Sequence, residues 1–507
     1  MRLPFLLAAF AALVFAPALH AQGLVTCQSG VADEDGNPGT PFNNFPCGSV
    51  DLYAHLPHGT FGTNYGNDIW GWTHAPSGRE FALVGLDNGT AFVEVTDPNA
   101  PVYLGKLPTA TSSSTWRDIK TYADHAFVVS EANNHGLQIF DLTRLLDVAS
   151  PPVTFTHDAR FTGFGSAHNV AVDPESGFAY AVGSDECSGG LYIVDVRDPL
   201  NPTQAGCFGS DGYTHDAQCL VYEGPDADYA GRQICVGSQG SSFGSGDHFV
   251  FVDVTDKASP VLISRVYYPN PGYAHQSWFT DDFRYILADD ELDSSSGGTR
   301  TLVMDVSDLD NPEFAFAHLG EVPTRDHNLY VKGQYAYQSN YDGGLRILDL
   351  SGIEDGTLAE AAYFDSEPTR QSPEGWDGQW SNYPFFPSGT VVANDQNNGL
   401  FVLRPNLPTT AAEPEAPGDA GFALSAPVPN PSRGEATLRL TVARSQRVRA
   451  EALDAAGRVV AVLHDAPVAA GAPLVLRLDG RALPSGLYLV RVVGEDFTAA
   501  RRASLVH

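Results

Sequence analysis

The stretch that decides the fold is LYIVDVRDP at residues 191–199. Its apolar run ends at Asp195 and is followed by a turn at Asp198 and Pro199, a pattern that predicts a buried strand with a tight exit. Similar segments occur at six further places, residues 91–98, 137–141, 249–256, 301–308, 345–349 and 400–404. Their anchors at positions 94, 141, 195, 253, 305, 349 and 404 lie 44 to 58 residues apart, the size of a four-stranded propeller blade.

A second signature precedes each of these segments. Its seven copies are Asn67-Asp68, Arg117-Asp118, His168-Asn169, His215-Asp216, His275-Gln276, His327-Asn328 and Trp380-Ser381. Each of the seven signatures is followed by one of the seven repeated apolar segments. We therefore expect each signature to begin the innermost strand of one blade. The sequence therefore predicts an all-β chain with a seven-bladed β-propeller over residues 61–405.

The repeated segment resembles the LVIVD repeat, and the whole span resembles the choice-of-anchor B family of secreted bacterial propellers. The most specific landmarks are GYTHDAQC at 212–219, DDELD at 289–293 and DHNLYVKG at 326–333. That resemblance implies a propeller fold. It implies no activity, because the family is named for its variable C-terminal anchors.

Composition divides the chain at a linker rich in Pro, Ala and acid, residues 406–420. The whole chain carries a net charge of -32, which repels nucleic acid. Residues 421–507 hold 11 Arg, no Lys and 7 acids, a charge of +4, so residues 1–420 carry -36. This C-terminal part alternates apolar and polar residues between turns, which predicts a small Ig-like β-sandwich.

Three C-terminal motifs resemble the type A sorting domain of the type IX secretion system. They are VPNP at 428–431, ALDAAGRVV at 452–460 and LPSGLYLVRV at 483–492. The resemblance implies a Gram-negative bacterium of the Bacteroidota or a relative, the type IX machinery and its sortase as partners, and a final location in the medium or on the outer cell surface. A carbohydrate-binding module is the alternative, although residues 381–507 contain no Trp for sugar stacking.

The N-terminal residues predict export. Met1-Arg2 is followed by an apolar run over residues 3–15 and by small residues up to Ala21, the pattern of a cleaved signal peptide over residues 1–21. No stretch approaches the length of a transmembrane helix. Residues 22–60 then form an N-terminal extension. In an oxidising space the six cysteines can form disulfides, and proximity suggests pairing Cys27 with Cys47, Cys187 with Cys207 and Cys219 with Cys235.

Histidines occupy equivalent strand starts in four consecutive repeats, His168, His215, His275 and His327. Imidazole beside carboxylate in a concave mouth suits a divalent transition metal or acid-base chemistry, so these four are candidate metal ligands. A repeated His can also serve only as a structural link between blades. Further candidates for this ligand-binding face are Arg117, Asp118, Asp216, Asp289, Asp290 and Glu291.

The sequence favours a binding module over an enzyme. The motif GSSFG at 240–244 has the spacing of a nucleophile elbow, but it lies in a Gly/Ser-rich loop with no helix after it. No catalytic residue is assigned, and the ligand is not identified. We therefore expect a secreted or surface-exposed interaction propeller, with a metal-dependent extracellular enzyme as the alternative. A divalent metal is the one cofactor that the histidines suggest.

Overall fold

The computed structural model describes residues 24–33, 44–240, 247–293, 298–370, 372, 375–407, 422–425, 427, 432, 435–454, 458–470, 474–484, 486–495 and 497–505. The signal-peptide segment, most of the linker, the VPNP motif and most of the GSSFG loop lie outside these residues. The regular structure of the described residues is almost entirely β-strand, and the strands form nine sheets. Among these residues, no helix is both long and apolar enough to cross a membrane.

Seven of the sheets follow one another along the chain, each built on four antiparallel strands. The sheets are β4 (Gly66–His74), β5 (Arg79–Leu86), β6 (Gly89–Glu94) and β7 (Val102–Pro108); β8 (Arg117–Tyr122), β9 (His125–Ser130), β10 (Leu137–Asp141) and β12 (Ala159–Phe161); β13 (Asn169–Asp173), β14 (Phe178–Val182), β15 (Leu191–Asp195) and β16 (Thr203–Phe208); β17 (Asp216–Val221), β18 (Gln233–Gln239), β19 (His248–Asp253) and β20 (Val261–Val266); β21 (Ala274–Phe279), β22 (Tyr285–Asp290), β23 (Arg300–Asp305) and β24 (Glu313–Leu319); β25 (Leu329–Lys332), β26 (Tyr335–Ser339), β27 (Leu345–Asp349) and β28 (Ala359–Phe364); and β29 (Gln379–Tyr383), β30 (Val391–Asp395), β31 (Gly399–Pro405) and β3 (Val50–Leu56).

Short elements complete this part of the chain. Strands β1 (Val31–Asp33) and β2 (Asn44–Gly48) extend the sixth sheet, and β11 (Val153–Thr154) pairs in parallel with β7. The 3-10 helices here are η1 (His58–Phe61), η2 (Leu142–Leu145), η3 (Cys187–Gly189) and η5 (Ile353–Asp355). Each repeated segment predicted from the sequence forms the third strand of its sheet, and each signature lies at the start of a first strand.

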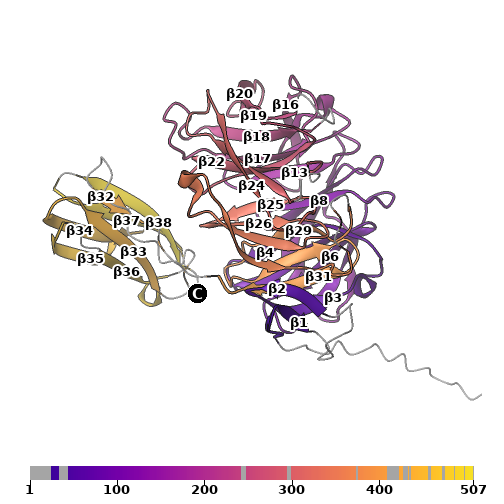
Figure 1. Ribbon diagram of the computed structural model, residues 1–507, viewed down its shortest axis with the longest axis horizontal. Coiled ribbons are helices and arrows are strands. Elements are labelled where there is room, and N and C mark those ends of the chain that lie inside the picture. Colours follow the sequence, from indigo (N-terminus) through magenta and orange to yellow (C-terminus); the bar gives the residue numbers. More distant parts are fainter. Residues whose placement is uncertain are drawn as a thin grey trace, which may run out of the picture.

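The first strands contact one another in a closed ring, β4, β8, β13, β17, β21, β25, β29 and back to β4. In Figure 1 those labelled lie towards the middle of the larger body. Side chains of the signatures link neighbouring sheets, because Asp118 Oδ2 accepts the Val170 amide at 2.8 Å and Gln276 Oε1 accepts the Leu329 amide at 2.5 Å. The ring closes where Asn394 Nδ2 donates to the Asn67 carbonyl at 2.8 Å. A ring of sheets built in this way is a β-propeller.

An apolar core fills the space between each pair of neighbouring sheets. In β5, Phe81 and Leu83 face the second sheet, whereas Ala82 and Val84 face the seventh. Strand residues alternate between the two faces, so a strand covered on both sides must be apolar throughout. This double coverage explains why the repeated segments are nearly continuous apolar runs rather than alternating ones.

The segment expected to be an N-terminal extension is part of the ring. Strand β3 pairs with β31 and completes the last sheet, and β2 pairs with β28 in the sixth. A domain boundary at residue 61 therefore divides a sheet. The physical reason is closure: a ring stays shut when strands from both ends of the chain share one sheet, which leaves no unpaired strand at the seam.

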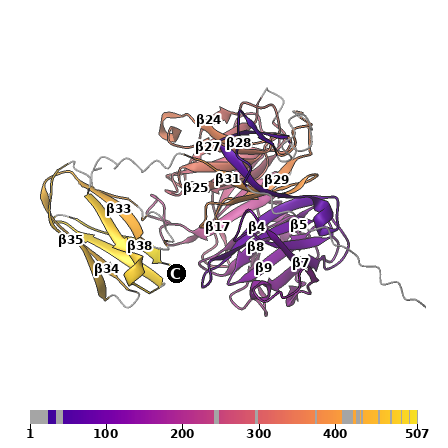
Figure 2. The same cartoon turned by 90° about the horizontal axis from the view of Figure 1, so that it is seen from below.

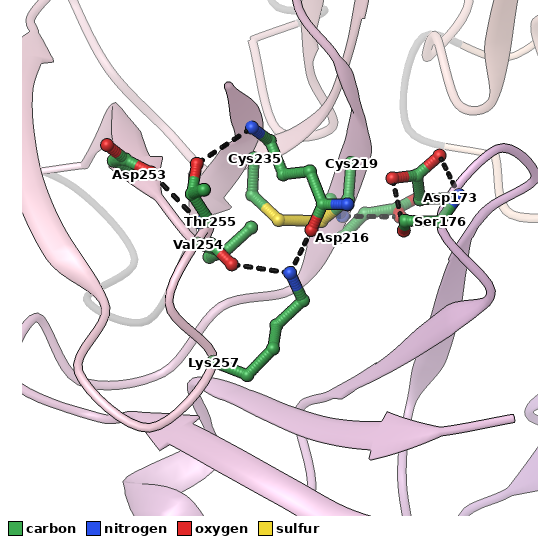
Figure 3. The surroundings of a disulfide bond; sticks show 11 residues. Asp173, Ser176, Asp216, Cys219, Cys235, Asp253, Val254, Thr255 and Lys257 are labelled. Atoms are coloured by element: carbon green, nitrogen blue, oxygen red, sulfur yellow. Dashed lines mark hydrogen bonds between the residues drawn. A yellow bond between two sulfur atoms is a disulfide. The ribbon is translucent and has the colours of Figure 1, made fainter. Parts of the chain in front are cut away.

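Three disulfides link the cysteines in the pairs that proximity suggested, Cys27–Cys47, Cys187–Cys207 and Cys219–Cys235. The first joins the start of the chain to β2. The third joins Cα partners on β17 and β18. Figure 3 shows its surroundings, where Lys257 Nζ donates to the Val254 carbonyl at 2.6 Å.

Replacing both Cys219 and Cys235 with Ala is expected to lower the free energy of unfolding by about 3 kcal/mol, because the bond closes a loop of 16 residues. Urea denaturation of the double variant and the wild type measures this loss. A matched double substitution at Cys27 and Cys47, which close a loop of 20 residues, should give a loss of similar size. An unchanged unfolding midpoint in both variants would contradict the prediction.

The C-terminal part forms two sheets, which Figures 1 and 2 show as a separate body in yellow. One sheet contains β32 (Phe422–Leu424), β33 (Glu435–Val442) and β36 (Leu474–Asp479); the other contains β35 (Val459–Val468), β34 (Gln446–Leu453), β37 (Gly486–Val493) and β38 (Thr498–Leu505), with η6 (Gly480–Ala482) between β36 and β37. Their inner faces share one apolar core drawn entirely from residues 422–505. The C-terminal part is therefore a two-sheet β-sandwich with its own core.

Candidate functional site

Four histidine rings form an arc at one end of the ring of first strands. His168 and His215 directly precede β13 and β17, His327 stands two residues before β25, and His275 is the second residue of β21. The ring centroids of successive imidazoles lie 4.2, 4.3 and 4.3 Å apart. Because equivalent positions of neighbouring sheets converge on the channel, the arc follows from the repeat itself. The four predicted metal ligands are therefore neighbours in space.

Each ring uses Nδ1 for a contact within the protein. Nδ1 of His215 lies 3.1 Å from the His275 carbonyl, and Nδ1 of His327 lies 2.6 Å from the Trp380 carbonyl. Since a carbonyl oxygen only accepts, these two nitrogens carry the proton. In the other two rings Nδ1 meets a carboxylate, Glu131 for His168 at 2.6 Å and Asp289 for His275 at 3.2 Å. A structural linking role thus occupies one nitrogen of each ring and leaves Nε2 for another partner.

A cavity of about 460 Å³ lies against the arc. Besides the four histidines its walls contain two carboxylates, Glu131 and Glu291. Its aromatic lining comprises Tyr65, Trp116, Tyr213, Tyr273, Tyr341, Trp376 and Trp380. Trp116 and Trp376 are 44% and 48% exposed, which places them where the cavity meets solvent. A concave site of this size, with polar groups that converge among aromatic rings, is typical of ligand pockets.

Burial keeps three imidazoles of the arc neutral, those of His215, His275 and His327. Burial holds the pKa of His215 well below its usual range, and the neighbouring His168 lowers it further. The pKa of His275 is lowered for the same reason, with His327 and His215 adding to the effect. Burial also lowers the pKa of His327 to about 3. At neutral pH these rings therefore present an unprotonated nitrogen rather than a cation.

Glu291 is the acidic residue of the cavity wall beside His327. Its Oε1 lies 3.8 Å from His327 Nε2 and accepts a 2.6 Å hydrogen bond from the Tyr341 hydroxyl. Burial raises the pKa of Glu291 to about 7, against the effect of that hydrogen bond. Its exposed counterpart at the other end of the arc is Glu131, which His168 contacts.

The other residues expected on the ligand-binding face do not line the cavity. Asp290 is buried and accepts the Tyr268 hydroxyl and the Gly272 and Tyr273 amides. Asp289 lies behind His275, and Asp216 accepts the Ala217 amide. Arg117 is buried and donates to the Leu86 carbonyl at 3.0 Å. A position at a strand end brings a residue close to the channel mouth, but the direction of its side chain decides whether it meets the cavity.

Asp118 belongs to a buried ionic cluster of the channel. Lys120 Nζ lies 2.7 Å from Asp118 Oδ1 and 3.7 Å from Asp68 Oδ2, and it lies over the Trp70 ring at 4.5 Å. Although burial opposes charge on both groups, their attraction raises the pKa of Lys120 and lowers that of Asp118. Burial and the nearby Asp118 charge raise the pKa of Asp68 well above its usual value. The cluster joins the first two sheets, because Asp68 Oδ2 also accepts the Ile119 amide.

The aromatic lining is the part of the site that the sequence analysis missed. Tyr213 and Tyr273 each stand two residues before a histidine of the arc, so a repeated Tyr-x-His was a usable signal. Tyr341 and Trp376 come from irregular segments after β26 and before β29. Nothing in their local sequence distinguishes them from ordinary loop aromatics.

Comparison with known proteins supports the repeat. Residues 326–353 match the LVIVD repeat family, over the sixth sheet. No curated protein matches the chain significantly. The repeat match and the ring of sheets together define an LVIVD-repeat β-propeller.

Three solved structures resemble the chain distantly. U3-55K matches at a TM-score of 0.46 and 10% identity over 70% of this chain and 98% of that one. The Cps50 (Swd1) β-propeller domain of Myceliophteria thermophila matches at 0.44 and 12%, with the same coverage of 70% and 98%. A Lactobacillus plantarum protein matches at 0.44 and 14% over 81% of this chain and 98% of that one. At these scores the likenesses add nothing to the sheets described above.

Proposed function

We propose that this chain is an exported interaction module, a seven-bladed β-propeller that binds a small polar ligand in the cavity beside the histidine arc. The observation that carries the proposal is the composition of the cavity wall, where neutral imidazole nitrogens and Glu291 lie among seven aromatic side chains. Buried hydrogen-bonding groups of this kind give orientation and specificity, and the aromatic rings give contact area.

The rim supplies the variant that tests binding. Trp376 is half exposed, and the Arg325 guanidinium lies over its ring at 4.1 Å. Tryptophan fluorescence of the exported protein is measured against a panel of sugars, amino acids, short peptides and small carboxylic acids. For any compound that binds, we expect Trp376→Ala to weaken the affinity by at least about tenfold, or ~1.4 kcal/mol.

Leu200→Ala is the matched control, because Leu200 is 51% exposed and does not line this cavity. Its affinity should equal that of the wild type. Binding that survives Trp376→Ala unchanged, or a panel with no binding compound, would count against the cavity as the ligand site.

Export is a second part of the proposal. We propose that residues 1–21 are a signal peptide, that the Ig-like sandwich over 421–507 is a type A sorting domain read by type IX machinery and its sortase, and that the propeller belongs to the choice-of-anchor B family of a Bacteroidota-like bacterium. Three disulfides are consistent with an extracellular protein. The separate core of the sandwich suits a module that is removed after export.

A metal-dependent extracellular enzyme is the second candidate. It is favoured by the proximity of His275, Glu291 and His327, which offer two nitrogens and an oxygen from one wall of the cavity. Binding of a ligand without turnover would separate the two candidates, because an enzyme should convert at least one compound of the panel when supplied with its metal.

A further inference from the structure

We infer that His275, Glu291 and His327 bind one divalent first-row transition metal ion of the zinc, iron or manganese type in the wall of the cavity. The inference rests on the proposed binding function of the same cavity and names what part of it binds. It selects three residues from a larger set, two of the four arc histidines and one of the acidic residues at the strand ends.

The donor atoms are close enough to share an ion. One ligand atom from each of the three residues lies within 4.8 Å of the other two, and His327 Nε2 is 3.8 Å from Glu291 Oε1. Around an ion with bonds of about 2.0–2.2 Å, neighbouring donors stand roughly 3–4 Å apart. Small rotations of the side chains therefore bring the three donors into place.

Each of the three donors is already held by a second group, as metal ligands usually are. Nδ1 of His327 is tied to the Trp380 carbonyl, and Nδ1 of His275 faces Asp289. Asp289 is itself fixed by the Gln276 amide at 2.7 Å. These contacts leave Nε2 of each ring as the metal donor and hold the ring plane. The hydroxyl of Tyr341 fixes Glu291 in the same way.

The charge balance suits a cation. Two imidazoles and one carboxylate lie together, with His327 Nε2 3.8 Å from Glu291 Oε1, and this donor set suits a divalent transition metal ion. The Glu291 side chain is 13% exposed and accepts one hydroxyl. The guanidinium of the neighbouring Arg325 donates through Nη1 to the Glu291 carbonyl rather than to its carboxylate. A metal ion at this point would supply the positive charge that the buried carboxylate lacks.

Three protein ligands leave open positions on the ion, and these face the cavity. His215, whose ring lies 4.3 Å from that of His275, stands beside the open side, as does Tyr273. Two histidines and one carboxylate with open positions are typical of sites that exchange ligands, in contrast to closed four-ligand structural sites. We therefore expect the bound ion to take a water molecule or a polar group of the ligand.

A second group of potential metal ligands, three aspartates, differs from the proposed site in its exposure and its partners. Asp226, Asp308 and Asp310 also come within 4.8 Å of one another, but two of them are exposed. Their oxygens accept the Leu309 amide, the Asn311 amide and the Tyr229 hydroxyl. Carboxylates at a surface turn with these local partners form no site by themselves.

To test this inference, the exported protein is first stripped of metal with a chelator. It is then titrated with Zn²⁺, followed by calorimetry, and with Co²⁺, followed by visible absorption. We expect one ion per chain with micromolar or tighter affinity. The double variant His275→Ala/His327→Ala should lose at least about 100-fold in affinity, and Glu291→Gln, which keeps the side-chain shape, about 10- to 100-fold. Circular dichroism establishes whether each variant is folded. If the double variant is not folded, the affinity of Glu291→Gln tests whether these residues bind the ion.

The matched control is His248→Ala, which removes another histidine–carboxylate pair, His248 Nε2 to Asp211 at 2.9 Å, outside the cavity lining. It should bind metal as the wild type does. Absence of binding in the wild type at millimolar Zn²⁺, or full affinity in Glu291→Gln, would overturn the inference. Because this titration uses the metal alone, its failure leaves the small-molecule panel unaffected, and failure of the panel leaves the metal result unaffected.

Discussion

Replacing Lys120 with Met is expected to lower the free energy of unfolding by about 3–5 kcal/mol, because it leaves the buried Asp118 carboxylate without its partner. The side chain of Lys120 is 12% exposed, and that of Asp118 is 6% exposed. Methionine keeps the length of the side chain and its contact with the Trp70 ring. The loss therefore reports the charge rather than the packing. Urea denaturation measures it.

The control for this variant is an ion pair at the surface. Arg197 and Asp195 form one in which the arginine side chain is 64% exposed, so Arg197→Ala should leave the urea midpoint close to that of the wild type. Adding Asp118→Asn to Lys120→Met should recover part of the lost stability, since the unpaired charge is then absent. A Lys120→Met variant as stable as the wild type would contradict a stabilising contribution of the Lys120–Asp118 pair.

Deleting residues 421–507 is expected to abolish appearance of the propeller outside the cell while leaving its fold intact. The apolar core of the sandwich contains no residue from the propeller, so removal exposes no propeller core. If the sandwich is the sorting signal, the shortened protein should accumulate inside the outer membrane. Immunoblots of the medium, the cell surface and the periplasm measure the distribution.

The thermal unfolding midpoint of the shortened protein is the control for folding, and it should match that of the propeller in the full chain. A secreted form that still contains residues 421–507 would contradict removal of the domain. Normal secretion of the shortened protein would contradict the sorting function itself.

The repeat made most of the fold predictable from the sequence. Seven apolar segments with regular spacing predicted the third strands, and the signature before each predicted where the first strands begin. Both depend on local alternation and turn chemistry, which a single sequence displays. The closing strand Val50–Leu56 was not recognised, because its partner β31 lies about 350 residues further along the chain and no local pattern indicates the pairing.

The site was predictable in part for the same reason. The histidines recur at one position of the repeat, so their convergence followed from the fold. The function of each ring nitrogen could not be predicted in this way. The Nδ1 partners of His275 and His327 come from other strands, Asp289 of β22 and Trp380 of β29. A histidine residue could not be assigned as either a structural link or a ligand, because its two nitrogens differ in function. Nδ1 of each ring links protein groups, and Nε2 is left for a ligand.

The most direct test of the account is anomalous X-ray diffraction from crystals of the exported protein soaked in Zn²⁺, recorded above and below the zinc absorption edge. We expect the strongest peak in the cavity, within bonding distance of His275, Glu291 and His327, with the ion open towards the rim at Trp376. Peaks confined to Asp226, Asp308 and Asp310 at the surface, or a cavity without an anomalous peak, would contradict it.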